Sequence, residues 1–263
     1  MACPRRAYGS PVTAGQALAQ VSSPAAGHKD ERQIMIWILF IGTMALSLWA
    51  MWRVKSVYKR YSQGVVRSGL TGGEVAEQIL RRTGIRDVEI AHADGMLGDH
   101  YDPIHKRLVL SSENYHGRSP AALGVAAHEC GHAIQHARAY APLHWRMAAV
   151  GITSYANYVV MLLPMFGLFT GLITPLTGAL FMAVAWGIIM LFNLVTLPVE
   201  FDASRRAKVV LADFGFIAPG EEATGVKRVL DAAAWTYVAA FITSLAYFLW
   251  HLLPLLTGGR QRD

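Results

Sequence analysis

The chain has 263 residues, of which 53% are hydrophobic and only 16% are charged. Soluble domains carry about 25% charged residues, so the composition argues against an ordinary cytosolic globule, and its apolar content argues against a chain disordered throughout. The net charge of +6 comes from 24 Lys and Arg against 18 Asp and Glu. No recognised nucleic-acid motif accompanies this charge, so we expect no nucleic-acid partner.

Residues 1–33 are rich in Ala, Gly, Pro and Ser and show no hydrophobic periodicity. This pattern predicts a disordered N-terminal tail. The segment also lacks the apolar stretch of a secretion signal. Met35 opens the first apolar run directly, and one hypothesis is that translation of the native protein begins near it. An intact native mass that includes residues 1–33 would exclude this hypothesis.

Long uncharged stretches predict four transmembrane helices. The first is residues 34–52, whose 19 residues span about 28 Å, enough for a bilayer core of about 30 Å. Residues 147–199 contain no charged residue and no His over 53 positions, which is too long for one span. We therefore expect two helices at 148–170 and 179–198, separated by a turn rich in Gly and Pro. Residues 232–256 form the fourth span.

Four spans place the polar segments 53–146 and 199–231 on one side of the bilayer and both termini on the other. Positive residues cluster beside the spans on the side of the polar segments: Arg53, Lys55, Lys59, Arg60, Arg67, Arg138, Arg146, Arg205, Arg206, Lys208, Lys227 and Arg228. Because Lys and Arg mark the cytoplasmic ends of spans, we predict that both polar segments are cytoplasmic.

The larger polar segment, residues 53–146, has the pattern helix, strand, strand, helix. A capping box opens the first predicted helix, residues 71–82. Residues 88–91 and 107–111 are rich in β-forming residues and predict two strands. Residues 119–139 begin with Ser-Pro, which is typical of a helix start, and predict the second helix.

The second predicted helix contains His128-Glu129-Cys130-Gly131-His132, an H-E-x-x-H motif. The two His side chains lie on one helical face about 6 Å apart along the axis, so both imidazoles can reach one zinc ion. Glu129 is placed to act as general base toward a water molecule. Gly131 is unusual inside a helix and predicts the close approach of another backbone.

A catalytic zinc usually has three protein ligands, so a third must come from elsewhere. His136 lies about 12 Å along the axis from His128, too far to share the metal. Glu200, just beyond the third span and on the same side as the motif, is the expected third ligand. Asp202 would point about 200° away, and we expect it to pair with the arginines that follow it. The predicted centre is one Zn²⁺ per chain held by His128, His132 and Glu200, with Glu129 catalytic.

Several runs of sequence resemble the bacterial membrane-bound neutral zinc metallopeptidases of the YugP type, over roughly residues 34–257. The runs are Tyr101-Asp-Pro103, Leu108-Val-Leu-Ser111, Asn114-Tyr115, Val125-Ala-Ala-His-Glu-Cys-Gly-His-Ala-Ile-Gln-His136 and Leu197-Pro-Val-Glu-Phe-Asp-Ala-Ser-Arg-Arg-Ala207. The resemblance implies a zinc-dependent protease of the bacterial inner membrane, with His128 and His132 as ligands and Glu129 as catalytic acid and base.

The arrangement is also similar to gluzincin membrane proteases related to the heat-shock protease HtpX and the CAAX prenyl endopeptidase. In these relatives the third ligand is the Glu of a Glu-x-x-x-Asp helix. Glu200 matches that Glu, but the Asp position is occupied by Ser204. The resemblance therefore implies that the carboxylate beside the ligands is missing here or is supplied by Asp202.

We predict a mainly α membrane protein with four transmembrane helices and a small cytoplasmic α+β zincin-like (gluzincin) protease domain. Its expected activity is hydrolysis of membrane or membrane-proximal proteins, with residues 107–111 binding the extended substrate as an added strand. The alternative is a non-catalytic membrane scaffold with a structural zinc site. Glu129 argues against a scaffold, because a structural site needs no general base. Five residues are candidates for stabilising the oxyanion, and the sequence does not choose among them: His92, His100, Tyr115, Tyr140 and His144.

Overall fold

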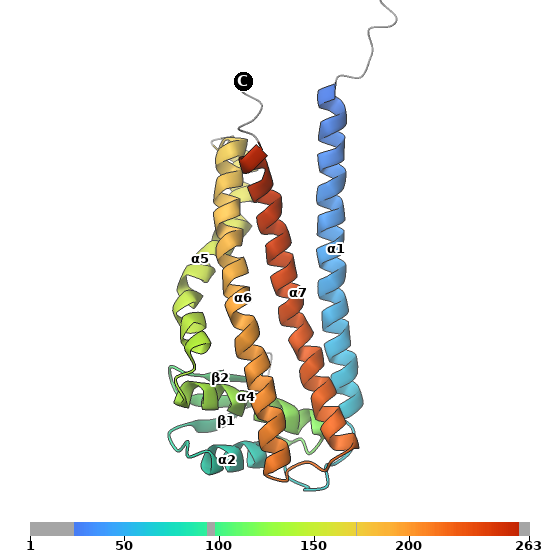
Figure 1. Cartoon of the computed structure of the whole chain (residues 1–263), viewed down its shortest axis with the longest axis vertical. Coiled ribbons are helices and arrows are strands. Elements are labelled where there is room, and N and C mark those ends of the chain that lie inside the picture. Colours follow the sequence, from blue (N-terminus) through green and yellow to red (C-terminus); the bar gives the residue numbers. More distant parts are fainter. Residues whose placement is uncertain (1–23, 94–97, 172, 258–263) are drawn as a thin grey trace, which may run out of the picture. The chain divides into compact units, whose positions relative to one another are not determined.

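The computed structural model describes residues 24–93, 98–171 and 173–257. Its elements are α1 (Pro24–Tyr61), α2 (Gly72–Arg82), β1 (Glu89–Ala93), β2 (His100–Asp102), β3 (Arg107–Ser111), α3 (Ser112–His116), α4 (Pro120–Ala137), α5 (Ala141–Thr170), α6 (Pro175–Asp213) and α7 (Glu221–Thr257) (Figure 1). Contacts divide the chain into two units, residues 1–42 and 43–263. The first unit contains the N-terminal part of α1, and the second contains all the other elements.

Four helices are long and apolar enough to cross a membrane, the number that the sequence predicts: Gln33–Tyr61, Ala141–Gly167, Pro175–Asp213 and Glu221–Thr257. Each begins before the predicted stretch, and all but Ala141–Gly167 also end after it, because a charged residue ends an uncharged run without ending a helix. The helix α1 begins at Pro24, so residues 24–33 of the expected disordered tail are helical. Residues 1–23 of that tail lie outside the described residues.

The helix α6 packs against α5 and α7, and Figure 1 shows α6 and α7 side by side. Polar and aromatic contacts join α6 to α7. The Asn193 amide donates to the Ser244 hydroxyl at 3.0 Å and to the Ala240 carbonyl at 3.2 Å. Trp186 stacks on Tyr247 with ring centroids 4.7 Å apart. Such hydrogen bonds hold helices together where apolar surroundings offer no alternative partner.

The three strands form one sheet in the order β1-β3-β2, with β1 parallel and β2 antiparallel to β3. The central strand is therefore β3, whose residues 108–110 are buried. The prediction that residues 107–111 bind a substrate strand is wrong, because both edges of β3 are already paired. The strand β2 and the helix α3, with three and five residues, are not predicted from the sequence.

The helices α2 and α4 begin where the sequence predicts. The Thr71 hydroxyl accepts from the Glu74 amide at 3.2 Å, and the Glu74 carboxylate accepts from the Thr71 amide at 2.7 Å, which completes the capping box of α2. The Ser119 hydroxyl caps α4 by accepting from the Ala122 amide at 3.2 Å. Cys130, inside α4, is fully buried, and burial raises the pKa of its thiol, so it is a packing residue.

The helix α4 crosses α6 at Gly131. A Cβ atom built on Gly131 would lie 2.6 Å from the Ala203 carbonyl oxygen and 3.1 Å from its Cα atom. This contact confirms the close backbone approach that the sequence predicts for Gly131. It lets α6 approach α4 at the level of the H-E-x-x-H motif, because Gly131 lies within that motif.

Replacing Gly131 by Ala should force the two helices apart. Overpacking of this kind costs about 1–3 kcal/mol, so the midpoint of thermal unfolding in detergent should fall. The control is Gly151→Ala in α5, where the added Cβ would have nothing within 4 Å. An equal midpoint for Gly131→Ala and wild type would contradict the described crossing.

Candidate metal centre

Two imidazoles of α4 lie side by side. His128 and His132 are one helical turn apart, and their ring centroids are 4.8 Å apart. His132 is buried, whereas His128 is partly exposed. The i and i+4 spacing therefore brings both rings to one face of α4, as the motif predicts.

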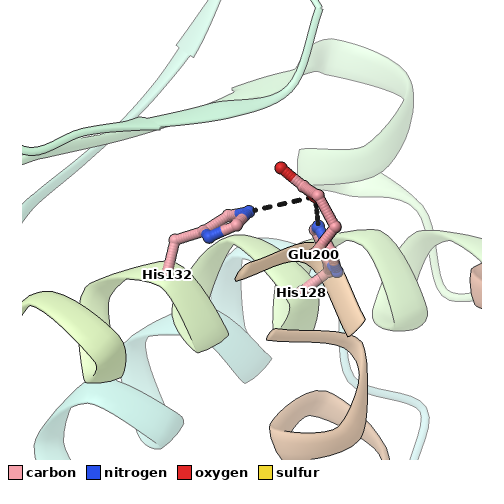
Figure 2. A group of neighbouring side chains, drawn as sticks. All are labelled: His128, His132 and Glu200. Carbon is pink, nitrogen blue, oxygen red and sulfur yellow. Dashed lines mark hydrogen bonds and ion pairs between the residues drawn. The ribbon is translucent and has the colours of Figure 1, made fainter. Parts of the chain in front are cut away.

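Glu200 joins these two imidazoles from α6. Its Oε2 atom lies 3.2 Å from His128 Nε2 and 3.5 Å from His132 Nε2, and Figure 2 shows the carboxylate directed at both rings. One donor atom from each of the three residues lies within 4.8 Å of the others. The crossing at Gly131 makes this possible, because Glu200 precedes Ala203 by about one turn of α6.

This donor set fits a zinc ion. Two imidazole nitrogens and one carboxylate oxygen are a ligand set of catalytic zinc sites. Within the part of the chain that the structure describes, this is the one group of three metal-binding side chains. Burial alone would lower the pKa of His132, but the carboxylates of Glu200 and Glu129 outweigh burial and raise it. The same carboxylates favour a bound cation at this position.

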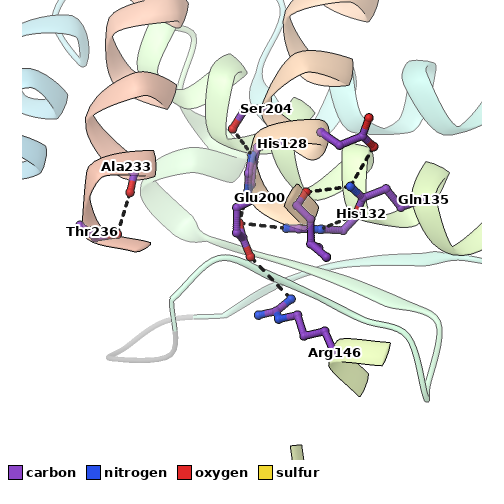
Figure 3. A network of polar contacts seen from close by, with 10 residues as sticks. His128, His132, Gln135, Arg146, Glu200, Ser204, Ala233 and Thr236 are labelled. Atoms are coloured by element: carbon purple, nitrogen blue, oxygen red, sulfur yellow. Dashed lines mark hydrogen bonds and ion pairs between the residues drawn. The ribbon is translucent and has the colours of Figure 1, made fainter. Parts of the chain in front are cut away.

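Hydrogen bonds on the far side of each ring fix its orientation. The Ser204 hydroxyl lies 3.1 Å from His128 Nδ1. The Gln135 Oε1 atom lies 3.1 Å from His132 Nδ1 (Figure 3). Because an amide oxygen only accepts hydrogen bonds, His132 donates from Nδ1 to Gln135, which leaves Nε2, the nitrogen that faces Glu200, as the atom available to a metal ion.

Asp202 contacts Gln135, and Gln135 in turn contacts His132. The Gln135 amide nitrogen donates to Asp202 Oδ2 at 3.0 Å and to the Val199 carbonyl at 2.8 Å. Asp202 also forms ion pairs with Arg205 and Arg206, which confirms the predicted pairing. Asp202 is thus connected to His132 through Gln135, while the Ser204 hydroxyl contacts His128 directly.

Two residues near Glu200 are not among the site residues that the sequence predicts. Arg146, at the start of α5, has its Nη1 atom 3.6 Å from Glu200 Oε1. Tyr237, from α7, lines the same cavity as Glu200. In the sequence, Arg146 belongs to the positive flank of one predicted span and Tyr237 lies inside another, uncharged one. Neither pattern signals a role in a site, because only the packing of three helices brings them together.

The donors open onto a cavity of about 320 Å³. Its lining residues are Asp99, His100, Tyr101, Pro103, His128, Glu129, His132, Leu143, Arg146, Met147, Val150, Glu200 and Tyr237. Glu129, the predicted catalytic residue, therefore shares the cavity with all three predicted ligands. The volume lies near the lower end of the range for ligand-binding pockets, about 300–1,000 Å³.

Only His100, among the five oxyanion candidates, lines this cavity. His92 and Tyr115 contact each other elsewhere, with centroids 5.0 Å apart. His144 lies beside His136 at 6.0 Å, and Tyr140 lies under Arg206 at 5.9 Å.

His136 lies outside the donor group, as its distance along the helix predicts. Its Nδ1 atom is 2.9 Å from the Tyr101 hydroxyl. Burial, followed by the charges of His144 and Lys106, lowers the pKa of His136. The contact between His136 and the Tyr101 hydroxyl therefore connects α4 to β2.

Residues 36–256 match the family described as "Putative neutral zinc metallopeptidase". The chain is 41% identical over 221 residues to "Putative membrane protease YugP" of Bacillus subtilis (strain 168), which covers 84% of this chain and 96% of that relative. No solved structure matches the chain.

The contact between Ser204 and His128 predicts an effect on metal binding. Loss of a hydrogen bond to a metal-ligating His lowers metal affinity about tenfold to a hundredfold. Ser204→Ala should therefore weaken zinc binding by that factor in a competition titration with a zinc chelator. The matched control is Ser154→Ala, because the Ser154 hydroxyl bonds the Val150 carbonyl on α5 at 3.0 Å. Equal zinc affinity in both variants would contradict the role of Ser204.

Proposed function

We propose that this chain, which belongs to the neutral zinc metallopeptidase family, is a zinc endopeptidase that cleaves membrane-associated proteins. The observation that carries the proposal is the convergence of His128, His132 and Glu200 beside Glu129 in one cavity. Family membership supports the reaction class, and the four apolar helices support an association with the bilayer.

His128, His132 and Glu200 are the proposed ligands of one Zn²⁺. Bound zinc would lower the pKa of a water molecule and polarise a peptide carbonyl. Imidazole Nε2 atoms and a carboxylate oxygen supply the three protein ligands of such a site. The bonds from Ser204 and Gln135 keep both imidazoles in the orientation that binding needs.

Glu129 is the proposed general base and acid. It is 7% exposed and lines the cavity, so its carboxylate reaches the bound peptide while remaining largely shielded from bulk water. The carboxylate accepts a proton from the attacking water and then passes it to the nitrogen of the leaving amine. His100, Arg146 and Tyr237 are the cavity residues proposed to donate hydrogen bonds to the carbonyl oxygen.

The strand β2 is the proposed binding edge for the peptide backbone. It lies at the end of the sheet order β1-β3-β2, and its residues His100 and Tyr101 line the cavity. An extended peptide added to this edge passes beside Glu129. Strand addition supplies main-chain hydrogen bonds without demanding a particular sequence, which suits an endopeptidase.

The proposed location is the cytoplasmic face of the bacterial inner membrane, with four membrane crossings. Figure 1 shows β1, β2, α2 and α4 together at one end of α5, α6 and α7. The positive residues that flank the expected spans belong to this end in the sequence, which supports a cytoplasmic orientation. Such an active site would meet peptide segments close to the bilayer surface.

A structural zinc site in a scaffold is the less favoured function. Structural sites are usually closed by four protein ligands. Among the described residues only three donors gather here, and they face a cavity. Three ligands and an open side are the arrangement of a catalytic site.

Replacing Glu129 by Gln should separate metal binding from catalysis. The variant should retain about one zinc per chain by elemental analysis, because Glu129 is not among the donor group. Its proteolytic rate should fall by about a hundredfold to ten-thousandfold, the usual range for loss of a general base. The control is Glu77→Gln on α2, an exposed residue outside the cavity. Undiminished proteolysis by Glu129→Gln would overturn the mechanism.

Removal of the metal should abolish the activity reversibly. Dialysis of the wild-type protein against a zinc chelator should remove both zinc and proteolysis, and added zinc should restore both. In a competition titration with a zinc chelator, Glu200→Gln should bind zinc more weakly than the wild type, because the amide that replaces the carboxylate carries no charge. Full proteolysis by zinc-depleted protein would contradict the proposal.

A further inference from the structure

One wall of the cavity is a single face of α5. The residues Leu143, Arg146, Met147 and Val150 line the cavity, and their spacing of three, four and seven residues places them on one side of the helix. Three of these four side chains are apolar. These three apolar side chains, Leu143, Met147 and Val150, are therefore a defined surface that the proposed chemistry leaves unused.

The remaining walls of the cavity are lined mostly by polar residues. Asp99, His100 and Pro103 come from β2 and the residues beside it. His128, Glu129 and His132 come from α4. A peptide bound between these walls therefore meets polar groups on the sheet side and apolar side chains on the α5 side.

The charge on the α5 face is already balanced. Arg146 lies 3.6 Å from the Glu200 carboxylate, and Figure 3 shows its guanidinium directed at Glu200. An acidic substrate side chain would have to compete with this buried carboxylate for Arg146. The apolar residues of the same face have no such partner, so they favour an apolar group.

Exposure changes along the α5 face. Leu143 is 3% exposed, whereas Val150 is 50% exposed. The direction from Leu143 to Val150 is also the direction in which α5 enters the span expected at residues 148–170. The apolar wall thus begins beside the donors and continues toward the proposed bilayer surface.

We propose that Leu143, Met147 and Val150 form a specificity subsite, which binds a large apolar side chain of the substrate next to the bond that is cut. The inference rests on the proposed function and adds the class of substrate residue. A leucine-sized or phenylalanine-sized side chain buries its surface against α5, while its backbone lies along β2. Burial of such a side chain contributes about 1.5–3 kcal/mol, which corresponds to roughly a tenfold to hundredfold preference over a small polar side chain.

The first experiment measures cleavage preference. Wild-type protein in liposomes digests a mixed peptide library, and mass spectrometry identifies the residues on both sides of each cut. One flanking position should be enriched in Leu, Ile, Met and Phe. Cleavage without enrichment at either position would overturn the subsite while leaving the proposed function intact.

The second experiment assigns the preference to α5. Met147→Gln keeps the side-chain length, and Val150→Thr keeps the shape, but each makes the subsite polar. In both variants the ratio of kcat/KM for a preferred Leu peptide to that for its Ser counterpart should fall at least fivefold. The matched control is Met161→Gln, also on α5, which is 62% exposed and lies outside the cavity lining. An unchanged ratio in both subsite variants would overturn the proposal.

A binding measurement distinguishes a wrong assignment of the subsite from a wrong assignment of the proposed function. In the Glu129→Gln background, the Kd of the same Leu and Ser peptides can be measured without cleavage. The Leu peptide should bind about tenfold more tightly, and Met147→Gln should remove that difference. Equal Kd values for the two peptides would overturn the subsite. A zinc-loaded wild type that cleaves no peptide would instead overturn the proposed function.

Discussion

A buried carboxylate facing two imidazoles is the contact on which the arrangement of the site depends. Glu200 is 3% exposed, and an ionised carboxylate so far from water must be compensated by positive charge or by hydrogen bonds. His128 and His132 face its Oε2 atom, and Arg146 faces its Oε1 atom. These partners come from α4 and α5, so satisfying one side chain of α6 fixes the mutual position of three helices.

This contact is possible because α4 and α6 approach closely at Gly131. Hydrogen bonds between their polar side chains then fix those side chains in place. Gly131 removes the Cβ atom that would keep α4 away from Ala203. Gln135 then connects His132 to Asp202 on α6. The polar side chains of this crossing are therefore bonded to one another, as buried polar networks must be if they are not to destabilise the fold.

Local patterns predicted much of this structure. Capping residues predict where α2 and α4 begin, and runs without charged residues predict the number of long apolar helices. The spacing of the motif predicts that His128 and His132 lie on one face of α4. Glu200 is predicted as a ligand from its position just beyond the third predicted span and from its match to the ligand Glu of the resembling proteases. The rest depends on packing that no local pattern records. A three-residue strand such as β2 has too little alternation to recognise, and without it β3 resembles an available edge. Arg146 and Tyr237 were missed because each fits the ordinary composition of its own helix.

The continuity of α6 has a mechanical consequence. Its 39 residues join the proposed third span to the segment that carries Glu200, with no loop between them. A displacement of α6 along its axis by the rise of one residue would therefore carry the Glu200 carboxylate about 1.5 Å. That distance is large beside zinc–ligand bonds of about 2 Å. A bilayer whose thickness shifts or tilts the proposed third span would thus also shift Glu200 relative to His128 and His132.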